Sequence, residues 1–486
     1  MQSERKHSRD RLPEEINIGI SRAIGRPRTV LDVGCGLGLN GAVAKLVGAT
    51  VVGIESDVAN AARARRLLDE VLELDVLDFA AIEKALGDRK FDLVLFPEVL
   101  ERVADPSALV RWFARFLEPE GHVVASLRNR EAWTAKLHML TPELGYAPAP
   151  EAKLFDRHEA RAILESAGLD VLRVEHNPML ARAARPYLDE SLWSSHRLSD
   201  EGSTAFTDLP VYKAYLATVR PFEVAVTDAL PGLLAYQHIV VARTKPVARK
   251  LSVTIGMLTM DEEESIERMM NEIRLAAPDA QVLCIDSSMR DQTPVIAERM
   301  GARVVRQLPP RGHGPAMEVL MYEAAKQSEA LIYLDCDFTY PPEVIPQIRA
   351  ILESGIDVVN AARTRERPDA MPLPNYLANR TFARLGQISS GANVADLHSG
   401  MRGYRTSVIR AFSFDGEGDA IPIDTLLWPA KCGYHVVEIP LDYQERVGYS
   451  KLRKVAGTVW TFIRLAKTLT VGRRHGGFYD TWSGKA

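Results

Sequence analysis

The sequence is short of cysteine, of long apolar runs and of net charge. Its 486 residues contain four cysteines, none in a CxxC pair, so we expect neither a disulfide framework nor a zinc knuckle, and a reducing, cytoplasmic location. No apolar run approaches the roughly 18 residues of a membrane span, and residues 1–11 are too polar for a secretory signal. The formal net charge of −4 gives no reason to expect a nucleic-acid partner.

The composition is that of an ordinary globular protein, with 46% hydrophobic and 26% charged residues. Short apolar runs alternate with helical patterns in two series. The runs of the first series lie at 29–33, 51–54, 91–96 and 122–126, and those of the second at 251–255, 281–285 and 330–334. This alternation predicts α/β domains with helices on both faces of a parallel sheet. We interpret residues 243–250 as a linker and residues 179–232 as an insertion or lid. Two doubly wound domains, 1–247 and 248–486, are therefore predicted.

Residues 31–41 form a glycine-rich segment after the first predicted strand. Glycines at a strand end let a ligand approach the backbone, and the next helix offers free N–H groups. Gly36, Gly38 and Gly41 also fit the GxGxxG pattern of dinucleotide-binding dehydrogenases, and a turn without a ligand is a further alternative. The segment resembles more closely the nucleotide loop of class I S-adenosylmethionine-dependent methyltransferases, in which an acidic residue, here Asp32, precedes the glycines.

The resemblance to these methyltransferases extends over residues 30–174. It implies a Rossmann-like domain that binds S-adenosylmethionine, with Glu55 on the two ribose hydroxyls and Asp75 facing the adenine amine. The cofactor-binding residues that it implies are Asp32, Gly34, Gly36, Gly38, Glu55 and Asp75.

The pair Glu101-Arg102 stands where this family often has Glu-His. Arginine cannot accept a proton at neutral pH. Three alternatives follow. Another group acts as the base, the methyl acceptor needs little activation, or the domain is degenerate and has lost its activity. A solvated helix pair is the alternative for Glu101 and Arg102.

Asp335 and Asp337 follow an apolar strand in the second half of the chain. Carboxylates two residues apart on an extended chain point the same way, and hard oxygen ligands at a strand end suit a divalent cation that bridges phosphates. A capped turn with solvated acids is the alternative.

The second half resembles family 2 glycosyltransferases of the GT-A fold, and among them the polyprenyl-phosphate sugar transferases. The matching motifs lie at 260–263, 285–293, 310–314, 335–343, 396–402 and 443–452. Ser287 and Leu258 depart from the family pattern, which leaves the nucleotide preference open. The chain lacks a Gln-x-x-Arg-Trp sequence, so the resemblance implies transfer of one sugar.

This second resemblance implies a role for each matched residue. Asp335 and Asp337 would hold Mg²⁺ or Mn²⁺ on the diphosphate of a nucleotide-sugar donor, and Glu262 and Asp286 would contact its base and ribose. Cations for the diphosphate or an acceptor phosphate would be Arg402, Arg446 and Lys451. The acceptor-side carboxylates would be Asp396 and Asp424, and the catalytic set would comprise Asp337, Asp424, Asp396 and Arg446.

Residues 455–471 have apolar side chains at helical spacing among several cations. Such a helix can lie on an anionic membrane surface or pack on its own domain. The sequence therefore predicts a bifunctional cytoplasmic enzyme. If this helix lies on the membrane, the enzyme is peripheral at the inner face of that membrane. It would transfer a sugar to a lipid phosphate or glycan and a methyl group to the product of the same pathway. The alternative is a glycosyltransferase that acts on a soluble acceptor and carries an inactive, structural or sensing methyltransferase-like domain.

Overall fold

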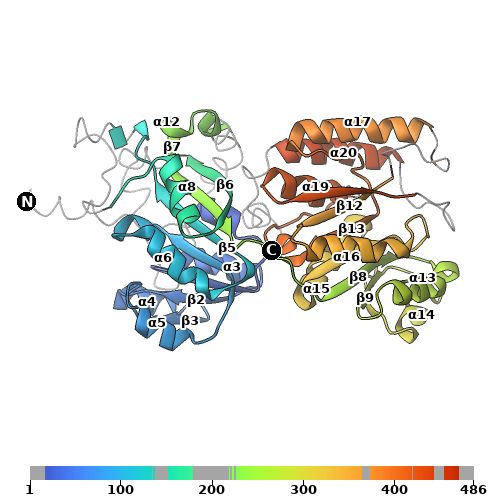
Figure 1. Cartoon of the computed structure of the whole chain (residues 1–486), viewed down its shortest axis with the longest axis horizontal. Helices are drawn as coiled ribbons and strands as arrows, with labels where there is room; N and C mark the ends of the chain where they lie inside the picture. The colour runs from blue at the N-terminus through green and yellow to red at the C-terminus, as the bar shows by residue number, and fades with distance from the viewer. Residues whose placement is uncertain are drawn as a thin grey trace, which may run out of the picture. The chain divides into compact units, whose positions relative to one another are not determined.

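The computed structural model describes residues 17–133, 135–136, 152–178, 218, 222–223, 226–363, 371, 373–418, 420–442 and 454–469. The chain forms two compact units that divide between Lys245 and Pro246 (Figure 1). Each unit is described by itself. Most of the predicted insertion at 179–232 and the motif at 443–452 lie outside the described residues.

The first unit is built on a seven-stranded sheet with the order β3-β2-β1-β4-β5-β7-β6. Its strands are β1 (Thr29–Val33), β2 (Thr50–Ile54), β3 (Glu70–Leu72), β4 (Phe91–Pro97), β5 (Leu117–Arg128), β6 (Asp170–Pro178) and β7 (Ala235–Arg243). Its helices are α2 (Ile18–Ala23), α3 (Leu39–Leu46), α4 (Val58–Ala64), α5 (Phe79–Leu86), α6 (Pro106–Phe113), α8 (Arg157–Ser166) and α12 (Pro231–Leu234). The five strands β3, β2, β1, β4 and β5 are parallel to one another. Strand β7 is antiparallel to its neighbours β5 and β6.

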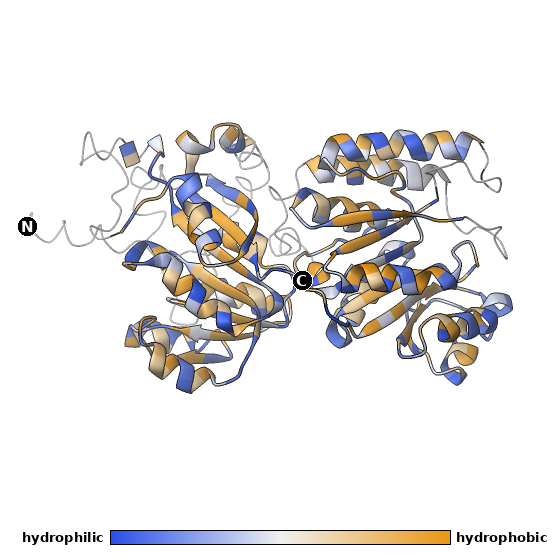
Figure 2. Cartoon of the chain, viewed as in Figure 1, coloured by the Kyte–Doolittle hydropathy of each residue, from blue (hydrophilic) through white to orange (hydrophobic). Residues whose placement is uncertain are grey.

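Helices cover both faces of this sheet, as predicted. Successive residues of a strand point to opposite faces. Accordingly, Leu31 and Val33 pack in one buried cluster with α5, α6 and α8, and Val30 packs in another with α2, α3 and α4. Figure 2 shows the strands as mainly hydrophobic and the outer helix faces as hydrophilic.

The second unit has a seven-stranded sheet with the order β10-β9-β8-β11-β13-β12-β14. Its strands are β8 (Val253–Thr259), β9 (Gln281–Asp286), β10 (Arg303–Arg306), β11 (Ala330–Leu334), β12 (Val358–Ala362), β13 (Met401–Arg405) and β14 (Val436–Pro440). Its helices are α13 (Glu263–Ala276), α14 (Thr293–Arg299), α15 (His313–Gln327), α16 (Ile345–Glu353), α17 (Leu373–Ser390), α18 (Thr406–Arg410), α19 (Ile421–Lys431) and α20 (Lys454–Leu469).

This sheet departs from the predicted parallel arrangement at β13, which is antiparallel to β11 and β12. The register pairs Leu334 with Met401, so the end of β11 meets the start of β13. The antiparallel strand therefore brings residues 396–400 beside the predicted metal motif. Among the described residues, no helix is both long and apolar enough to cross a membrane.

Candidate functional sites

The glycine loop of the first unit joins the end of β1 to α3. Gly34, Gly36 and Gly38 have φ angles of 67°, 55° and 81°, which side chains other than glycine rarely adopt. A Cβ atom added to Gly34 would also collide with the Val99 side chain. The loop therefore needs glycine for its conformation and leaves its backbone bare.

Glu55 follows β2 and lies against this loop. Its Oε2 accepts a hydrogen bond from the Gly36 backbone N–H at 2.8 Å, and its Oε1 accepts one from the Asp57 N–H at 2.8 Å. The structure thus places Glu55 in contact with the glycine loop, as expected of residues that were predicted to belong to one cofactor site. A half-exposed carboxylate beside a bare loop fits the ribose of a nucleoside such as S-adenosylmethionine.

Asp32 and Asp75 differ in their surroundings. Asp32 is completely buried in β1, and a Cβ atom added to Gly41 would lie 3.0 Å from its Oδ2. Asp32 is therefore placed beneath the loop and the start of α3. Asp75 is exposed after β3, and its Oδ1 accepts from the Leu77 N–H at 2.9 Å.

A buried ionic group that the sequence analysis missed follows β4. Glu98 has a φ of 56°, and its carboxylate contacts Arg128 Nη2 at 2.8 Å and Gln237 Nε2 at 2.5 Å. Arg128 also contacts Glu101 Oε2 through Nε at 3.2 Å. The alternative of a solvated Glu101-Arg102 pair is wrong for Glu101, which is 1% exposed, whereas Arg102 is exposed.

Burial raises the pKa of Glu101 to about 8, although the charge of Arg128 acts in the opposite direction. Gln237 connects this group to an amide network around the start of α3. Asn17 Nδ2 donates to Gln237 Oε1 at 2.9 Å, Asn177 Nδ2 donates to Asn17 Oδ1 at 2.7 Å, and the Asn17 N–H donates to Asn40 Oδ1 at 2.9 Å. No local pattern predicts the network, because its members are up to 220 residues apart.

In the second unit, Asp286 closes β9 and is fully buried. Its carboxylate accepts from Thr259 Oγ1 and Ser288 Oγ, both at 2.7 Å, and contacts Arg306 Nε at 3.2 Å. These contacts join the ends of β8, β9 and β10. Glu262 is half-buried at the start of α13, and its backbone N–H donates to Thr293 Oγ1 at 2.8 Å.

Asp335 and Asp337 follow β11 and lie against the loop before β13. The Asp335 N–H donates to the Gly400 carbonyl at 3.1 Å, and a Cβ atom on Gly400 would collide with the Asp335 carboxylate. Asp337 is 7% exposed, and its Oδ1 accepts from Thr339 N–H at 3.1 Å and Oγ1 at 2.5 Å. The alternative of solvated acids is thus wrong for Asp337.

The two carboxylates offer the hard oxygen donors that Mg²⁺ and Mn²⁺ prefer. In the part of the chain that the structure describes, no group of three or more His, Cys, Asp or Glu side chains is arranged to hold a metal ion. A cation at Asp335 and Asp337 would therefore need ligands beyond the His, Cys, Asp and Glu side chains of the described residues.

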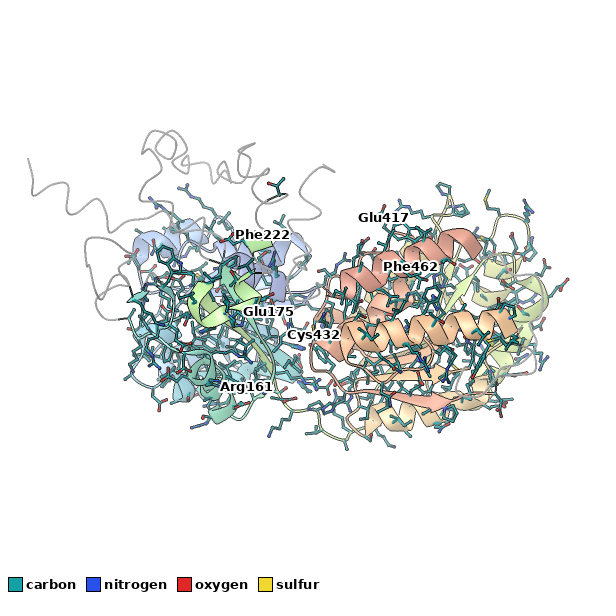
Figure 3. All side chains as sticks on the ribbon, turned by 90° about the horizontal axis from the view of Figure 1, so that it is seen from above. Arg161, Glu175, Phe222, Glu417, Cys432 and Phe462 are labelled. Atoms are coloured by element: carbon teal, nitrogen blue, oxygen red, sulfur yellow. The ribbon has the colours of Figure 1, made fainter. Side chains whose placement is uncertain are left out.

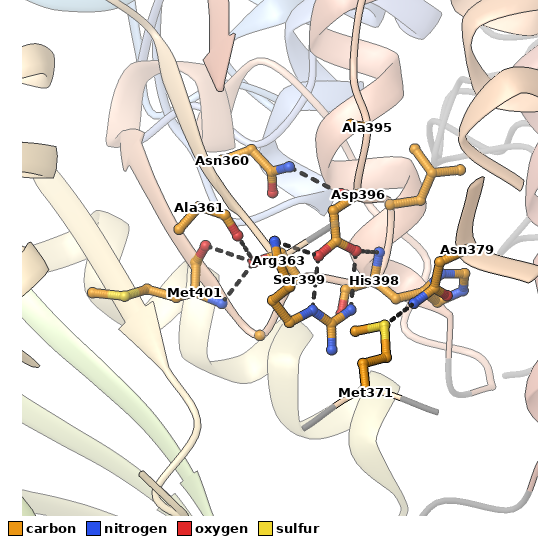
Figure 4. A network of polar contacts seen from close by, with 12 residues as sticks. Asn360, Ala361, Arg363, Met371, Asn379, Ala395, Asp396, His398, Ser399 and Met401 are labelled. Atoms are coloured by element: carbon orange, nitrogen blue, oxygen red, sulfur yellow. Dashed lines mark hydrogen bonds and ion pairs between the residues drawn. The ribbon is translucent and has the colours of Figure 1, made fainter. Parts of the chain in front are cut away.

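The buried Asp396 belongs to the polar network shown in Figure 4. Its Oδ2 accepts from Arg363 Nε at 2.7 Å, and its Oδ1 accepts from Arg363 Nη2 at 2.9 Å. Burial would raise the pKa of Asp396, but the charge and hydrogen bonds of Arg363 outweigh it and lower the pKa to about 2. Asp396 is therefore ionised and paired, and it anchors the loop before β13, while its role at the acceptor stays a prediction.

Arg402 is also engaged by groups inside the domain. It lies in β13, is fully buried, and donates from Nε to Asn360 Oδ1 at 2.6 Å and from Nη2 to the Leu397 carbonyl at 2.7 Å. Nη1 donates to the Pro422 carbonyl. These internal acceptors occupy the guanidinium, so it is not presented to a phosphate. Arg402 instead ties the loop before β13 to α19.

Asp424 on α19 is fully buried and forms an ion pair with Arg464 of α20. Burial raises the pKa of Asp424 to about 7, although Arg464 acts in the opposite direction. Among the described residues, no hydrogen-bond partner contacts its Oδ1. Arg446 and Lys451 lie outside the described residues.

The predicted C-terminal helix is present as α20, and it packs against α17 and α19. Two of its cations contact acids of the same unit, since Arg464 pairs with Asp424 and Lys467 Nζ contacts Asp415 Oδ2 at 2.7 Å. The alternative of a helix packed on its own domain is confirmed. The sequence carries no pattern that assigns the Arg464 partner, which is 40 residues away.

Comparison with known proteins matches each half to a family. The methyltransferase domain family matches residues 5–174, and glycosyl transferase family 2 matches residues 254–412. A dolichyl-phosphate hexose transferase of Haloferax volcanii is 37% identical over 208 residues, which are 43% of this chain and 88% of the relative. A ubiquinone biosynthesis O-methyltransferase of Paracidovorax citrulli is 35% identical over 168 residues, 32% of this chain and 71% of the relative.

Among solved structures, a glucosyl-3-phosphoglycerate synthase from Mycobacterium tuberculosis, in complex with Mn²⁺, uridine diphosphate and glucosyl-3-phosphoglycerate, is also similar. The TM-score is 0.37 at 19% identity, over 45% of this chain and 80% of that one.

Proposed function

Because the chain belongs to glycosyl transferase family 2 through its second half and to the methyltransferase domain family through its first, we propose that it is a bifunctional enzyme. The domain at 248–486 transfers one sugar from a nucleotide-sugar to a polyprenyl phosphate. The domain at 1–247 transfers a methyl group from S-adenosylmethionine to a product of the same pathway.

The observation that carries the sugar-transferase proposal is the convergence of carboxylates at adjoining strand ends. Glu262 and Asp286, after β8 and at the end of β9, are proposed to contact the nucleoside. Asp335 and Asp337, after β11, are proposed to hold Mg²⁺ or Mn²⁺ against the diphosphate. A cation there supplies charge neutralisation of the leaving nucleoside diphosphate.

The proposed acceptor is a phosphate rather than an alcohol. A phosphate is already anionic at neutral pH and needs no strong general base. Asp396 cannot serve as a strong general base at neutral pH, because its pKa is held at about 2. Asp424 is a buried carboxylate of this unit whose pKa, at about 7, suits a base, so we take it as the base that a hydroxyl acceptor would need. The similarity to a dolichyl-phosphate hexose transferase supports the phosphate.

The acceptor is tested by transfer of labelled sugar from a panel of nucleotide-sugars to a short-chain polyprenyl phosphate and to the matching polyprenol. We expect transfer to the phosphate alone, with Asp424→Asn retaining at least about half of the activity of the parent chain when equal amounts of folded protein are compared. Transfer to the alcohol that Asp424→Asn abolishes would replace the proposal with a hydroxyl acceptor. No transfer to either would overturn it.

The methyltransferase proposal rests on the glycine loop and Glu55. The alternative is an inactive domain, because Arg102 stands where the family often has a His that could act as a base. Calorimetry with S-adenosylmethionine and S-adenosylhomocysteine separates the two. Binding is expected for both, and methylation of the glycosylated lipid is then sought by mass spectrometry. Absence of binding would favour the inactive domain.

A further inference from the structure

The two acids of the proposed cation site are held in different ways. Asp337 is held within its own turn, because its Oδ1 accepts hydrogen bonds from the Thr339 N–H at 3.1 Å and from Thr339 Oγ1 at 2.5 Å. The Asp335 carboxylate lies against a different segment, the loop before β13. A Cβ atom added to Gly400 of that loop would collide with Asp335 Oδ2 and would lie 2.8 Å from Tyr340 Cε2. Asp335 and Tyr340 therefore meet at Gly400.

Gly400 is bonded to the metal motif through both of its backbone polar groups. Its carbonyl accepts from the Asp335 N–H at 3.1 Å, and its N–H donates to the Tyr340 hydroxyl oxygen at 2.6 Å. Gly400 does not have a positive φ, so the loop does not need glycine here for its backbone conformation. It needs glycine because the Asp335 carboxylate occupies the space that a side chain would take.

Tyr340 belongs to the same motif as the two acids, residues 335–343. Side chains fill the second unit between its sheet and its helices, as Figure 3 shows, and Tyr340 is 1% exposed among them. Its hydroxyl fixes the loop residue against which the first acid of the motif lies. Contacts of this kind behind a metal ligand orient the ligand and tune the affinity for the metal.

The loop before β13 also has anchors of its own. Ser399 Oγ donates to the Ala361 carbonyl at 2.5 Å, and Arg363 Nη2 donates to the His398 carbonyl at 2.8 Å (Figure 4). These bonds do not involve Tyr340, so we expect the loop to keep its place when the Tyr340 hydroxyl is removed. The effect of that hydroxyl is then confined to the glycine that it bonds and to the carboxylate beside that glycine.

We propose that Tyr340 is a positioning residue for the divalent cation, and that it acts through Gly400 on the orientation of the Asp335 carboxylate. The inference rests on the proposed cation at Asp335 and Asp337, and it adds the residues that hold the first of these acids in place. A tyrosine that only filled the core would contribute to the stability of the fold and would leave the affinity for the cation unchanged.

The test is a titration of the full chain with Mn²⁺, in which electron paramagnetic resonance measures the free ion. It is made with uridine diphosphate and with guanosine diphosphate in separate experiments, each corrected by a blank of nucleotide without protein. Tyr340→Phe should raise the Kd for Mn²⁺ about tenfold. The matched control is Tyr333→Phe, because Tyr333 is 2% exposed and its hydroxyl donates to the Ser399 carbonyl at 3.3 Å in the same loop. It should bind Mn²⁺ as the parent chain does.

A second pair of variants separates cation affinity from stability. Gly400→Ala should also weaken Mn²⁺ binding, because its methyl group takes the space of the Asp335 carboxylate. Gly403→Ala is its control, since a Cβ atom there would meet the side chains of Ile348 and Leu352. We expect Gly403→Ala to lower the thermal stability of the protein and to leave its affinity for Mn²⁺ unchanged.

Two results would overturn the inference: a Tyr340→Phe chain that binds Mn²⁺ as Tyr333→Phe does, or a loss of affinity in Gly403→Ala that equals the loss in Gly400→Ala. The second result would attribute the weaker binding to a less stable fold. A parent chain that binds no Mn²⁺ with either nucleotide would overturn the proposed cation itself. Failure of the proposed function is therefore read from the parent chain, and failure of the inference from the variants.

Discussion

At the scale of single residues, the strand-end acids were predictable and their buried partners were not. Asp335 and Glu55 directly follow short apolar runs and Asp337 comes two residues after Asp335, so the sequence alone places them at a sheet edge. Arg402 and Asp396 belong to matched motifs too, but Asn360 and Arg363, distant in sequence, determine what their side chains do. Sequence patterns predict position along an element better than they predict tertiary partners.

Glu55→Ala should weaken binding of S-adenosylmethionine. The change removes two charge-assisted hydrogen bonds to the ribose, worth roughly 1.5–3 kcal/mol each before compensation, so we expect at least about a tenfold rise in Kd. Titration calorimetry measures it, with Glu83→Ala as a control, because Glu83 is an exposed carboxylate paired only with surface Arg115 in the described structure. Equal affinity in the two variants would remove Glu55 from the site.

Glu101 should make the stability of the protein fall as pH rises. Its pKa is about 8 in the folded chain against an ordinary 4.5, so between these values the unfolded chain releases the proton first and folding is progressively disfavoured. Glu101→Gln should flatten the pH dependence of denaturant-induced unfolding between about pH 4.5 and 8, whereas Glu83→Gln should leave it unchanged. A slope that survives Glu101→Gln would show that Glu101 is not its source.

At the scale of elements, the alternating apolar runs predicted the central strands and the helices that cover them. They did not predict the antiparallel β7 and β13, because strand direction depends on connections and pairing rather than on local pattern. The direction of β13 has a consequence for the site, since it places Gly400 against Asp335. The apolar periodicity of α20 likewise predicted a helix but not which face it buries.

The Arg464–Asp424 pair should fix α20 to α19. Arg464→Met removes the charge that holds down the pKa of Asp424, so the buried carboxyl becomes protonated and loses its partner. The free energy of unfolding should fall by about 1–3 kcal/mol, the cost of an unsatisfied buried polar group. Replacement of both residues, as Arg464→Met with Asp424→Leu, should restore most of that loss. Denaturant unfolding of the two single variants and the double variant gives the coupling energy. Additive losses in the double variant would contradict a direct pair.

At the scale of the whole molecule, two α/β units of different families occur in one chain, each with predicted site residues at or directly after the ends of its strands. The family of each half could be predicted from short motifs, because those motifs lie at strand ends where ligands approach. The ionic group of Glu98, Arg128 and Glu101 could not, because it arises from packing between distant segments.

The central claim is that sugar transfer depends on a divalent cation at Asp335 and Asp337. The direct measurement is the rate of labelled sugar transfer to polyprenyl phosphate by Asp337→Asn, compared with Asp279→Asn, whose carboxylate is exposed and paired with Arg349. We predict that Asp337→Asn is at least about tenfold slower, some 1.4 kcal/mol in the barrier, with unchanged thermal stability. Asp279→Asn should match the parent chain, and a chelator should stop transfer until Mg²⁺ or Mn²⁺ is restored. Full activity of Asp337→Asn in the presence of the chelator would contradict the account.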